Sequence, residues 1–179
     1  MQPAHPISPA IRLRKLEPDD LPLLYAWEND SDAWLDSDTH NPLSQEDLRA
    51  YILRTTGDIY QDGQLRLMVC LGQQQDTSND EEGVPVGCVD LYDVDIRNRK
   101  AAVAIYIAPD YRGQGVAAQA LLQLKSYVSH ILCFRILYAY VREANRTSIR
   151  MFQSAGFQLV ATLPNWVNEG DVCVLQTAL

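Results

Sequence analysis

Two glycines stand between an apolar strand-like segment and a helical pattern, in the run Arg112-Gly113-Gln114-Gly115-Val116-Ala117. Glycine adopts the positive φ that tight turns need, and such turns direct successive N–H groups at one point. The start of the following helix adds unpaired N–H groups and a partial positive charge. The run therefore predicts a phosphate or pyrophosphate site, although a purely structural turn uses glycine in the same way.

This turn differs from two common phosphate motifs. No Gly-Lys-Ser/Thr follows the glycines, so the segment is not a P-loop. The third glycine of the dinucleotide fingerprint is absent, and the turn comes late in the chain. A different phosphate-bearing ligand is therefore expected.

A second polar segment follows at 145–157, where Asn145, Ser148 and Phe152 precede Gly156-Phe157. Together the two segments resemble the GNAT superfamily of N-acetyltransferases. Arg112, Gly115 and Ala117 match its Arg/Gln-x-x-Gly-x-Gly/Ala motif, and 145–157 resembles its Asn-x-x-Ala/Ser…Gly-Phe segment. The resemblance covers about 11–177, and residues 86–91 and 98–101 place it nearest the branch of spermidine and ribosomal-protein N-terminal acetyltransferases.

The resemblance implies an α/β (α+β) fold with a mixed, mostly antiparallel sheet, a splayed central strand pair and helices on both faces. The splayed strands would be 103–108 and 135–141, and the gap between them would take the pantetheine arm of acetyl-CoA. Backbone groups freed at such a gap hydrogen-bond an added extended chain. The cofactor set that the resemblance implies is Ile105, Ile107, Arg112, Gly113, Gln114, Gly115, Val116, Ala117, Asn145, Ser148 and Phe152.

Both usual catalytic positions of the family differ in this sequence. Relatives often carry Glu where this chain has Ala102, and Tyr where it has Phe152. Other groups then take over these roles, or proximity supplies most of the rate. A carboxylate usually serves as base, because a primary amine with a pKa near ~10 is protonated at neutral pH. Asp90, a carboxylate in an otherwise apolar strand, is the candidate base, and Tyr106 is the candidate phenol. Trp27 and Glu28, together with Asp90, are expected to contact the acceptor.

Charge is divided unevenly along the chain, whose net charge is −8. Twelve acidic and two basic residues lie between Glu17 and Asp62, whereas nine basic and two acidic residues lie between Arg97 and Arg150. The first region would attract a cationic acceptor and the second the phosphates of CoA, unless each is simply a solvated face. A protein this acidic is not expected to bind nucleic acid.

Hydrophobic periodicity predicts one α/β domain over 11–179, preceded by a flexible tail over 1–10. The expected strands are 11–16, 65–71, 84–92, 101–108, 135–141, 157–161 and 172–177. Helices are expected from Pro18 through Trp27, from Ser44 through Ile52, and over 115–131 and 145–155. A turn at 29–32 and a flexible hairpin loop at 73–83 complete the prediction.

The four cysteines are widely spaced in apolar segments, which favours free thiols in a reducing cytoplasm. Neither a metal site, a signal peptide nor a membrane span is expected. The sequence thus predicts a cytoplasmic enzyme that moves an acetyl group from acetyl-CoA to a polyamine, peptide N-terminus or amino sugar by direct attack. The alternative is a CoA-binding regulatory module with weak or no catalysis. A second copy of the chain, forming a homodimer, is the macromolecular partner considered.

Overall fold

The computed structural model describes residues 10–34, 41–72, 83–167 and 170–179. Seven strands form a single sheet in the order β1-β2-β3-β4-β5-β7-β6. All neighbouring strands are antiparallel except β4 and β5, which are parallel. The strands are β1 (Ile11–Lys15), β2 (Leu65–Leu71), β3 (Val84–Asp95), β4 (Lys100–Ile107), β5 (Ile136–Arg142), β6 (Gln158–Val167) and β7 (Gly170–Ala178).

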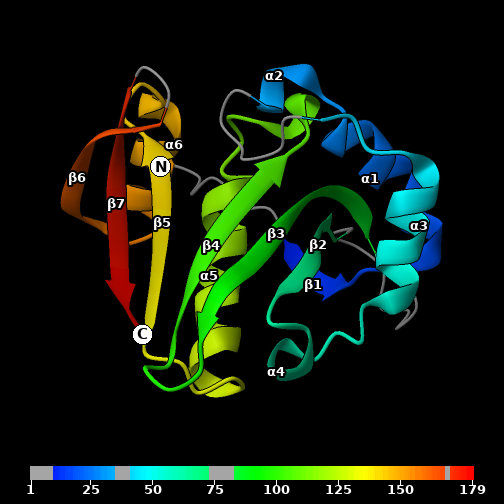
Figure 1. Ribbon diagram of the computed structural model, residues 1–179, viewed down its shortest axis with the longest axis horizontal. Helices are drawn as coiled ribbons and strands as arrows, with labels where there is room; N and C mark the ends of the chain where they lie inside the picture. Colours follow the sequence, from blue (N-terminus) through cyan, green and yellow to red (C-terminus); the bar gives the residue numbers. More distant parts are fainter. Residues whose placement is uncertain (1–9, 35–40, 73–82, 168–169) are drawn as a thin grey trace, which may run out of the picture.

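Helices cover both faces of the sheet, as the resemblance implied (Figure 1). The α-helices are α1 (Leu21–Glu28), α2 (Ser31–Trp34), α3 (Gln45–Arg54), α4 (Ile59–Asp62), α5 (Val116–His130) and α6 (Arg146–Ser154). Short 3-10 turns, η1 (Pro18–Asp20) and η2 (Pro109–Tyr111), precede α1 and the glycine turn.

The main core lies between the sheet and the pair α5 and α6. Leu121 and Leu124 of α5 are fully buried there, together with Leu137 of β5 and Leu175 of β7. Each such side chain contributes about 1.5–3 kcal/mol by leaving water. This core fixes β4, α5 and β5 relative to one another, which matters because the glycine turn joins the first two.

The opposite face of β2 and β3 packs against Trp27 of α1, and α1 in turn packs against α3. Met68, Cys70 and Cys88 are buried on this side, while their strand neighbours face α5, so both faces of these strands are covered. Ser44 begins α3 with a capping box, since its hydroxyl accepts from the Asp47 N–H at 3.1 Å and Asp47 bonds back.

The sequence predicted most elements to within a few residues. Three differences stand out: β6 continues to Val167 rather than ending at residue 161, Ser31–Trp34 is a short helix rather than part of a turn, and α4 was not predicted. Four-residue helices are too short to show a helical period. The loop expected at 73–83 and the tail expected at 1–10 fall largely outside the described residues, so those expectations, and the single-domain boundary with them, stay predictions.

Candidate active site

Strands β4 and β5 separate after a short stretch of pairing. Their register joins Lys100 to Ile136, Ala101 to Leu137 and Ala102 to Tyr138, and no described pair joins the two strands beyond that row. On its other side β4 stays paired with β3 as far as Ile107. The two strands therefore form a fork with its vertex at Ala102 and Tyr138, and Figure 1 shows them diverging in front of α5.

The glycine turn lies at the open end of this fork. Gly113 and Gly115 have φ of 75° and 79°, and Gly115 is the N-cap of the fifteen-residue helix α5. A Cβ at either glycine would meet no atom within 4 Å, so the space in front of the turn is open. The turn therefore combines an accessible backbone with a long helix N-terminus, which suits a phosphate group.

The Arg112 side chain makes two contacts within the protein. Its Nε donates to the carbonyl of Ile107 at 2.7 Å, and its guanidinium carbon lies 5.4 Å from the centre of the Tyr106 ring. Gln114 donates from Nε2 to the carbonyl of Asp110 at 2.9 Å. These bonds close the turn on the strand, so both side chains help to shape it.

One cleft of about 1740 Å³ connects the fork, the turn, α6 and the helices α1 and α3. Every residue that the sequence placed in the cofactor, acceptor or catalytic set lines this cleft, with Gln114 as the exception. The lining residues from that set are Trp27, Glu28, Asp90, Ile105, Tyr106, Ile107, Arg112, Gly113, Gly115, Val116, Ala117, Asn145, Ser148 and Phe152. The structure thus brings the predicted residues together, while their individual roles stay predictions.

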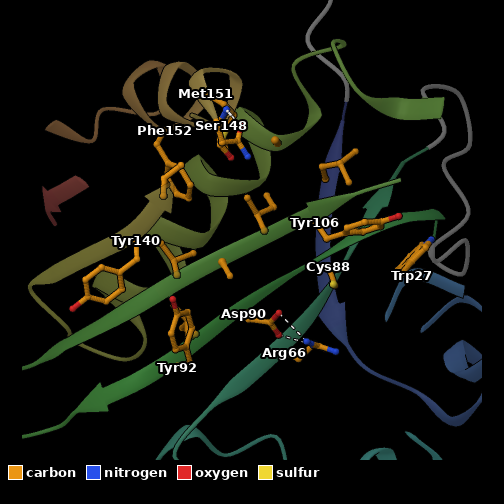
Figure 2. A pocket seen from close by; sticks show the side chains of 18 of the residues that line it. Trp27, Arg66, Cys88, Asp90, Tyr92, Tyr106, Tyr140, Ser148, Met151 and Phe152 are labelled. Atoms are coloured by element: carbon orange, nitrogen blue, oxygen red, sulfur yellow. Dashed lines mark hydrogen bonds and ion pairs between the residues drawn. The ribbon is translucent and has the colours of Figure 1, made fainter. Parts of the chain in front are cut away.

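Helix α6 forms one wall of the cleft, and Figure 2 shows its residues Ser148, Met151 and Phe152 across the cleft from Asp90 and Arg66. Asn145 caps this helix, since its side-chain oxygen accepts from the Ser148 N–H at 2.9 Å. Phe152 is buried and meets Phe157 edge-on, with ring centres 5.1 Å apart. Phe152 therefore presents a packed hydrocarbon ring at the position where relatives often carry a phenol.

The opposite end of the cleft is aromatic and acidic. Figure 2 shows Trp27 and Tyr106 there, with ring centres 5.8 Å apart. The Tyr106 hydroxyl donates to Oδ2 of Asp30 at 3.2 Å. Burial and the negative charge of Asp30 raise the pKa of Tyr106 to about 12.

An ion cluster that the sequence did not predict lies beside Trp27, on the acceptor side of the cleft. Arg66 of β2 donates to both carboxylate oxygens of Asp90, at 2.6 and 3.0 Å, and to Glu28 of α1. The guanidinium carbon also lies 5.7 Å from the centre of the Tyr51 ring. Arg66 is an isolated basic residue between apolar neighbours in the sequence, and that position was the available signal.

Cys88 is the cysteine that lines the cleft, and all four cysteines are free thiols. Burial, reinforced by the negative charge of Asp90, raises the pKa of the Cys88 thiol to about 12. A thiolate at this position is therefore scarce at neutral pH, which argues against a covalent acetyl-cysteine intermediate.

A protein-family comparison decides the family. The model described as an acetyltransferase (GNAT) domain matches residues 10–158. This chain belongs to the GNAT acetyltransferase family. The matched range contains the fork, the glycine turn and α6, so the elements described above are those of the GNAT domain.

Individual relatives match this GNAT chain over part of their length. Spermidine N(1)-acetyltransferase of Escherichia coli K12 is 29% identical over 82 residues, which cover 46% of this chain and 44% of that protein. Alpha/beta-tubulin-N-acetyltransferase 9 of Homo sapiens is 36% identical over 84 residues, covering 46% of this chain and 41% of that protein. The chain thus aligns with less than half the length of these curated relatives.

Solved structures confirm the GNAT fold over almost the whole chain. Spermidine N-acetyltransferase from Vibrio cholerae, in complex with CoA and spermine, superposes with a TM-score of 0.76 at 22% identity. The superposition covers 94% of this chain and 95% of that one. At this identity the likeness establishes the fold, and the chemistry has to be argued from the residues.

Two kinds of feature are absent from the described residues. No group of three or more His, Cys, Asp or Glu side chains is arranged there to hold a metal ion. In that same part of the chain, no helix is long and apolar enough to cross a membrane.

Proposed function

We propose that this GNAT protein transfers an acetyl group from acetyl-CoA to a primary amine by direct attack in a ternary complex. One observation carries the proposal: the unpaired fork, the glycine turn and an acidic, aromatic wall open into the same cleft. The turn suits the pyrophosphate of CoA, and the strand edges of the fork suit the amides of its pantetheine arm. A backbone N–H on the unpaired edge of β4 would stabilise the oxyanion.

The acceptor in this proposal is a cation, such as a polyamine, a peptide N-terminus or an amino sugar. Two carboxylates, Glu28 and Asp90, flank the single positive charge of Arg66, and Asp47 also lines this end of the cleft. The surplus of negative charge favours an ammonium ion, and the rings of Trp27 and Tyr106 add cation–π surface. The names of the spermidine acetyltransferase relatives support the polyamine choice.

The test is amine-dependent release of CoA thiol by the purified chain. Spermidine, a short peptide with a free N-terminus and an aminoglycoside form the panel, and an acidic amine of similar size serves as the control. Thiol release with a cationic amine, falling as salt rises, supports the proposal. Equal, salt-insensitive rates with the acidic amine contradict the cationic acceptor.

The alternative function is a CoA-binding regulatory module. Ala102 and Phe152 favour it, because neither side chain can exchange a proton. Binding of CoA without thiol release for any amine of the panel would establish the module and refute the transferase.

We propose further that the protein acts in the cytoplasm as a homodimer. Four free cysteines support a reducing compartment. The edge strand β6 supports self-association, because it exposes the apolar side chains Leu159, Val160 and Trp166. Light scattering on the purified chain distinguishes a dimer from a monomer.

A further inference from the structure

Tyr138 of β5 reaches across the vertex of the fork and holds the carboxylate of Asp93, which belongs to β3 on the far side of β4. It stands in one row with Ala102 of β4 and Tyr92 of β3. Its hydroxyl donates to Oδ2 of Asp93 at 2.5 Å. Residues in one row share a face of the sheet, so this bond passes over Ala102, the row's smallest side chain. The loss of the family's usual glutamate at Ala102 thus leaves room for a bond from β5 to β3.

The backbone turns Asp93 toward the cleft. Asp93 has a φ of 48°, and the pairing of β3 with β4 is irregular between Tyr92 and Asp95. Asp tolerates this left-handed conformation better than most residues. The result is a carboxylate that lines the cleft beside the vertex and remains accessible to solvent.

Asp93 differs from the other carboxylates of the cleft in the partners it has. Both oxygens of Asp90 accept hydrogen bonds from Arg66, which also binds Glu28. Among the described residues, Tyr138 alone donates to the Asp93 carboxylate, through Oδ2. Oδ1 therefore keeps its lone pairs for a proton, and no described cation contacts this carboxylate.

The expected path of acetyl-CoA brings the reacting atoms toward this vertex. From Ile107, next to the phosphate turn, to Ala102 the strand runs about 17 Å at ~3.3 Å per residue. A pantetheine arm that leaves the turn and follows the unpaired edge of β4 carries its thioester toward the closed end of the fork.

Resting on the acetyl-transfer function proposed above, we propose that Asp93 is the general base of the reaction and that Tyr138 is the positioning residue that holds it. The bound ammonium first gives one proton to solvent, and the neutral amine then attacks the thioester carbonyl carbon, so that a C–N bond forms. One N–H proton passes to Oδ1 of Asp93, directly or through one water, as the nitrogen becomes acidic. The C–S bond then breaks, and the thiolate leaves with the bonding pair and takes a proton from solvent.

Tyr138 suits this positioning role because it stays protonated. Burial and the Asp93 carboxylate raise the pKa of the Tyr138 phenol, so the hydroxyl remains a donor at neutral pH. The donated bond orients Oδ2 and leaves Oδ1 directed elsewhere, in the way that a third group orients a catalytic base.

The test compares D93N with D95N in acetyl transfer to the preferred amine. Asn keeps the shape of Asp and also tolerates positive φ, so D93N should fold normally. We expect kcat to fall about 100-fold in D93N with the KM for acetyl-CoA unchanged, since general-base catalysis contributes ~10²–10⁴-fold. Asp95 bonds Asn98 on the same hairpin and does not line the cleft, so D95N should stay within about twofold of the unmodified enzyme.

Chemical rescue separates catalysis from structure. D93G accepts the positive φ and leaves a gap at the cleft into which formate fits. Formate should restore D93G about tenfold or more and leave D90G, which has a comparable gap at Asp90, unaffected. Y138F should lower kcat about threefold to tenfold with the KM for acetyl-CoA unchanged, and an unchanged kcat would overturn the positioning role of Tyr138.

Two further outcomes overturn this inference alone: D93N with nearly full kcat, or D93G that formate does not rescue. If the unmodified enzyme releases no thiol with any amine, the proposed function itself fails.

Discussion

Arg66 and Asp90 form a two-pronged ion pair on the acceptor side of the cleft, with Nε–Oδ1 at 2.6 Å and the second nitrogen 3.0 Å from Oδ2. The same guanidinium binds Glu28 at the end of α1. Arg66 therefore ties the helix that carries Trp27 to the sheet that carries the fork. Its removal should affect both the stability of the fold and the acceptor site.

Replacing Arg66 by Met should lower the free energy of unfolding by about 3 kcal/mol, because it leaves two carboxylates without their cation. The side chains of Arg66, Glu28 and Asp90 are 17–23% exposed. The expected loss therefore lies at the low end of the range for breaking a buried ion pair. Urea denaturation measures the change. R146M is the control, since the Arg146–Glu143 pair is 63% and 44% exposed and should be worth less than about 0.5 kcal/mol.

Neutralising Glu28 should weaken binding of a cationic acceptor. We expect E28Q to raise the KM for the amine about threefold to tenfold, because one negative charge leaves the cleft wall. The KM for acetyl-CoA should not change. E46Q is the matched control, since the Glu46 side chain on α3 is 85% exposed and does not line the cleft. Equal effects of the two substitutions would show that the charge of the surface, and not this site, attracts the acceptor.

Cys88 should not carry the acetyl group. Its pKa of about 12 keeps the thiol protonated at neutral pH, so we expect initial-rate lines that intersect, as for a ternary complex. An alkylating reagent should modify one thiol of the folded protein, the exposed Cys133, and the three buried thiols only after unfolding. Parallel rate lines together with an acetylated Cys88 in the mass spectrum would refute direct transfer.

Tyr106 should matter for binding more than for proton transfer. With a pKa of about 12 it releases a proton less readily than a thiol, whose ordinary pKa is ~8.5. We therefore expect Y106F to keep kcat within about tenfold. A larger loss of kcat, with the KM for the amine unchanged, would restore Tyr106 as the general acid.

The raised pKa of Tyr106 also predicts a dependence of stability on pH. Above pH ~10 the unfolded phenol ionises while the folded one keeps its proton, so this group's contribution is complete below pH ~10 and is lost as pH rises toward 12. Urea denaturation of the unmodified protein and of Y106F between pH 9 and 11 should show that Y106F loses less of its free energy of unfolding. Identical losses would contradict the assigned pKa.

The sequence predicted those parts of the site that local pattern encodes. Gly113 and Gly115 indicated the turn, helical spacing indicated α5, and Asn145 marked the start of α6. The fork followed from the family resemblance and not from periodicity, because a paired and an unpaired strand share the same alternation of side chains.

The polar contacts within the cleft could not be predicted in this way. Arg66 meets Asp90 and Glu28 across 24 and 38 residues of sequence, and Tyr138 meets Asp93 across 45. Such pairs depend on strand register and on a bulge, which no local pattern specifies. For that reason the sequence indicated Asp90 as the candidate base, whereas the bond between Tyr138 and Asp93 is seen only in the folded structure.

The central claim is that acetyl-CoA binds with its pyrophosphate at the glycine turn, and A117E tests it most directly. Ala117 lines the cleft in the first turn of α5, where a glutamate suits the helix but repels a phosphate. Gln119, two residues on, does not line the cleft, so Q119E is the control. Calorimetry should show at least about 100-fold weaker CoA binding for A117E and unchanged binding for Q119E, whereas full affinity in A117E would contradict the account.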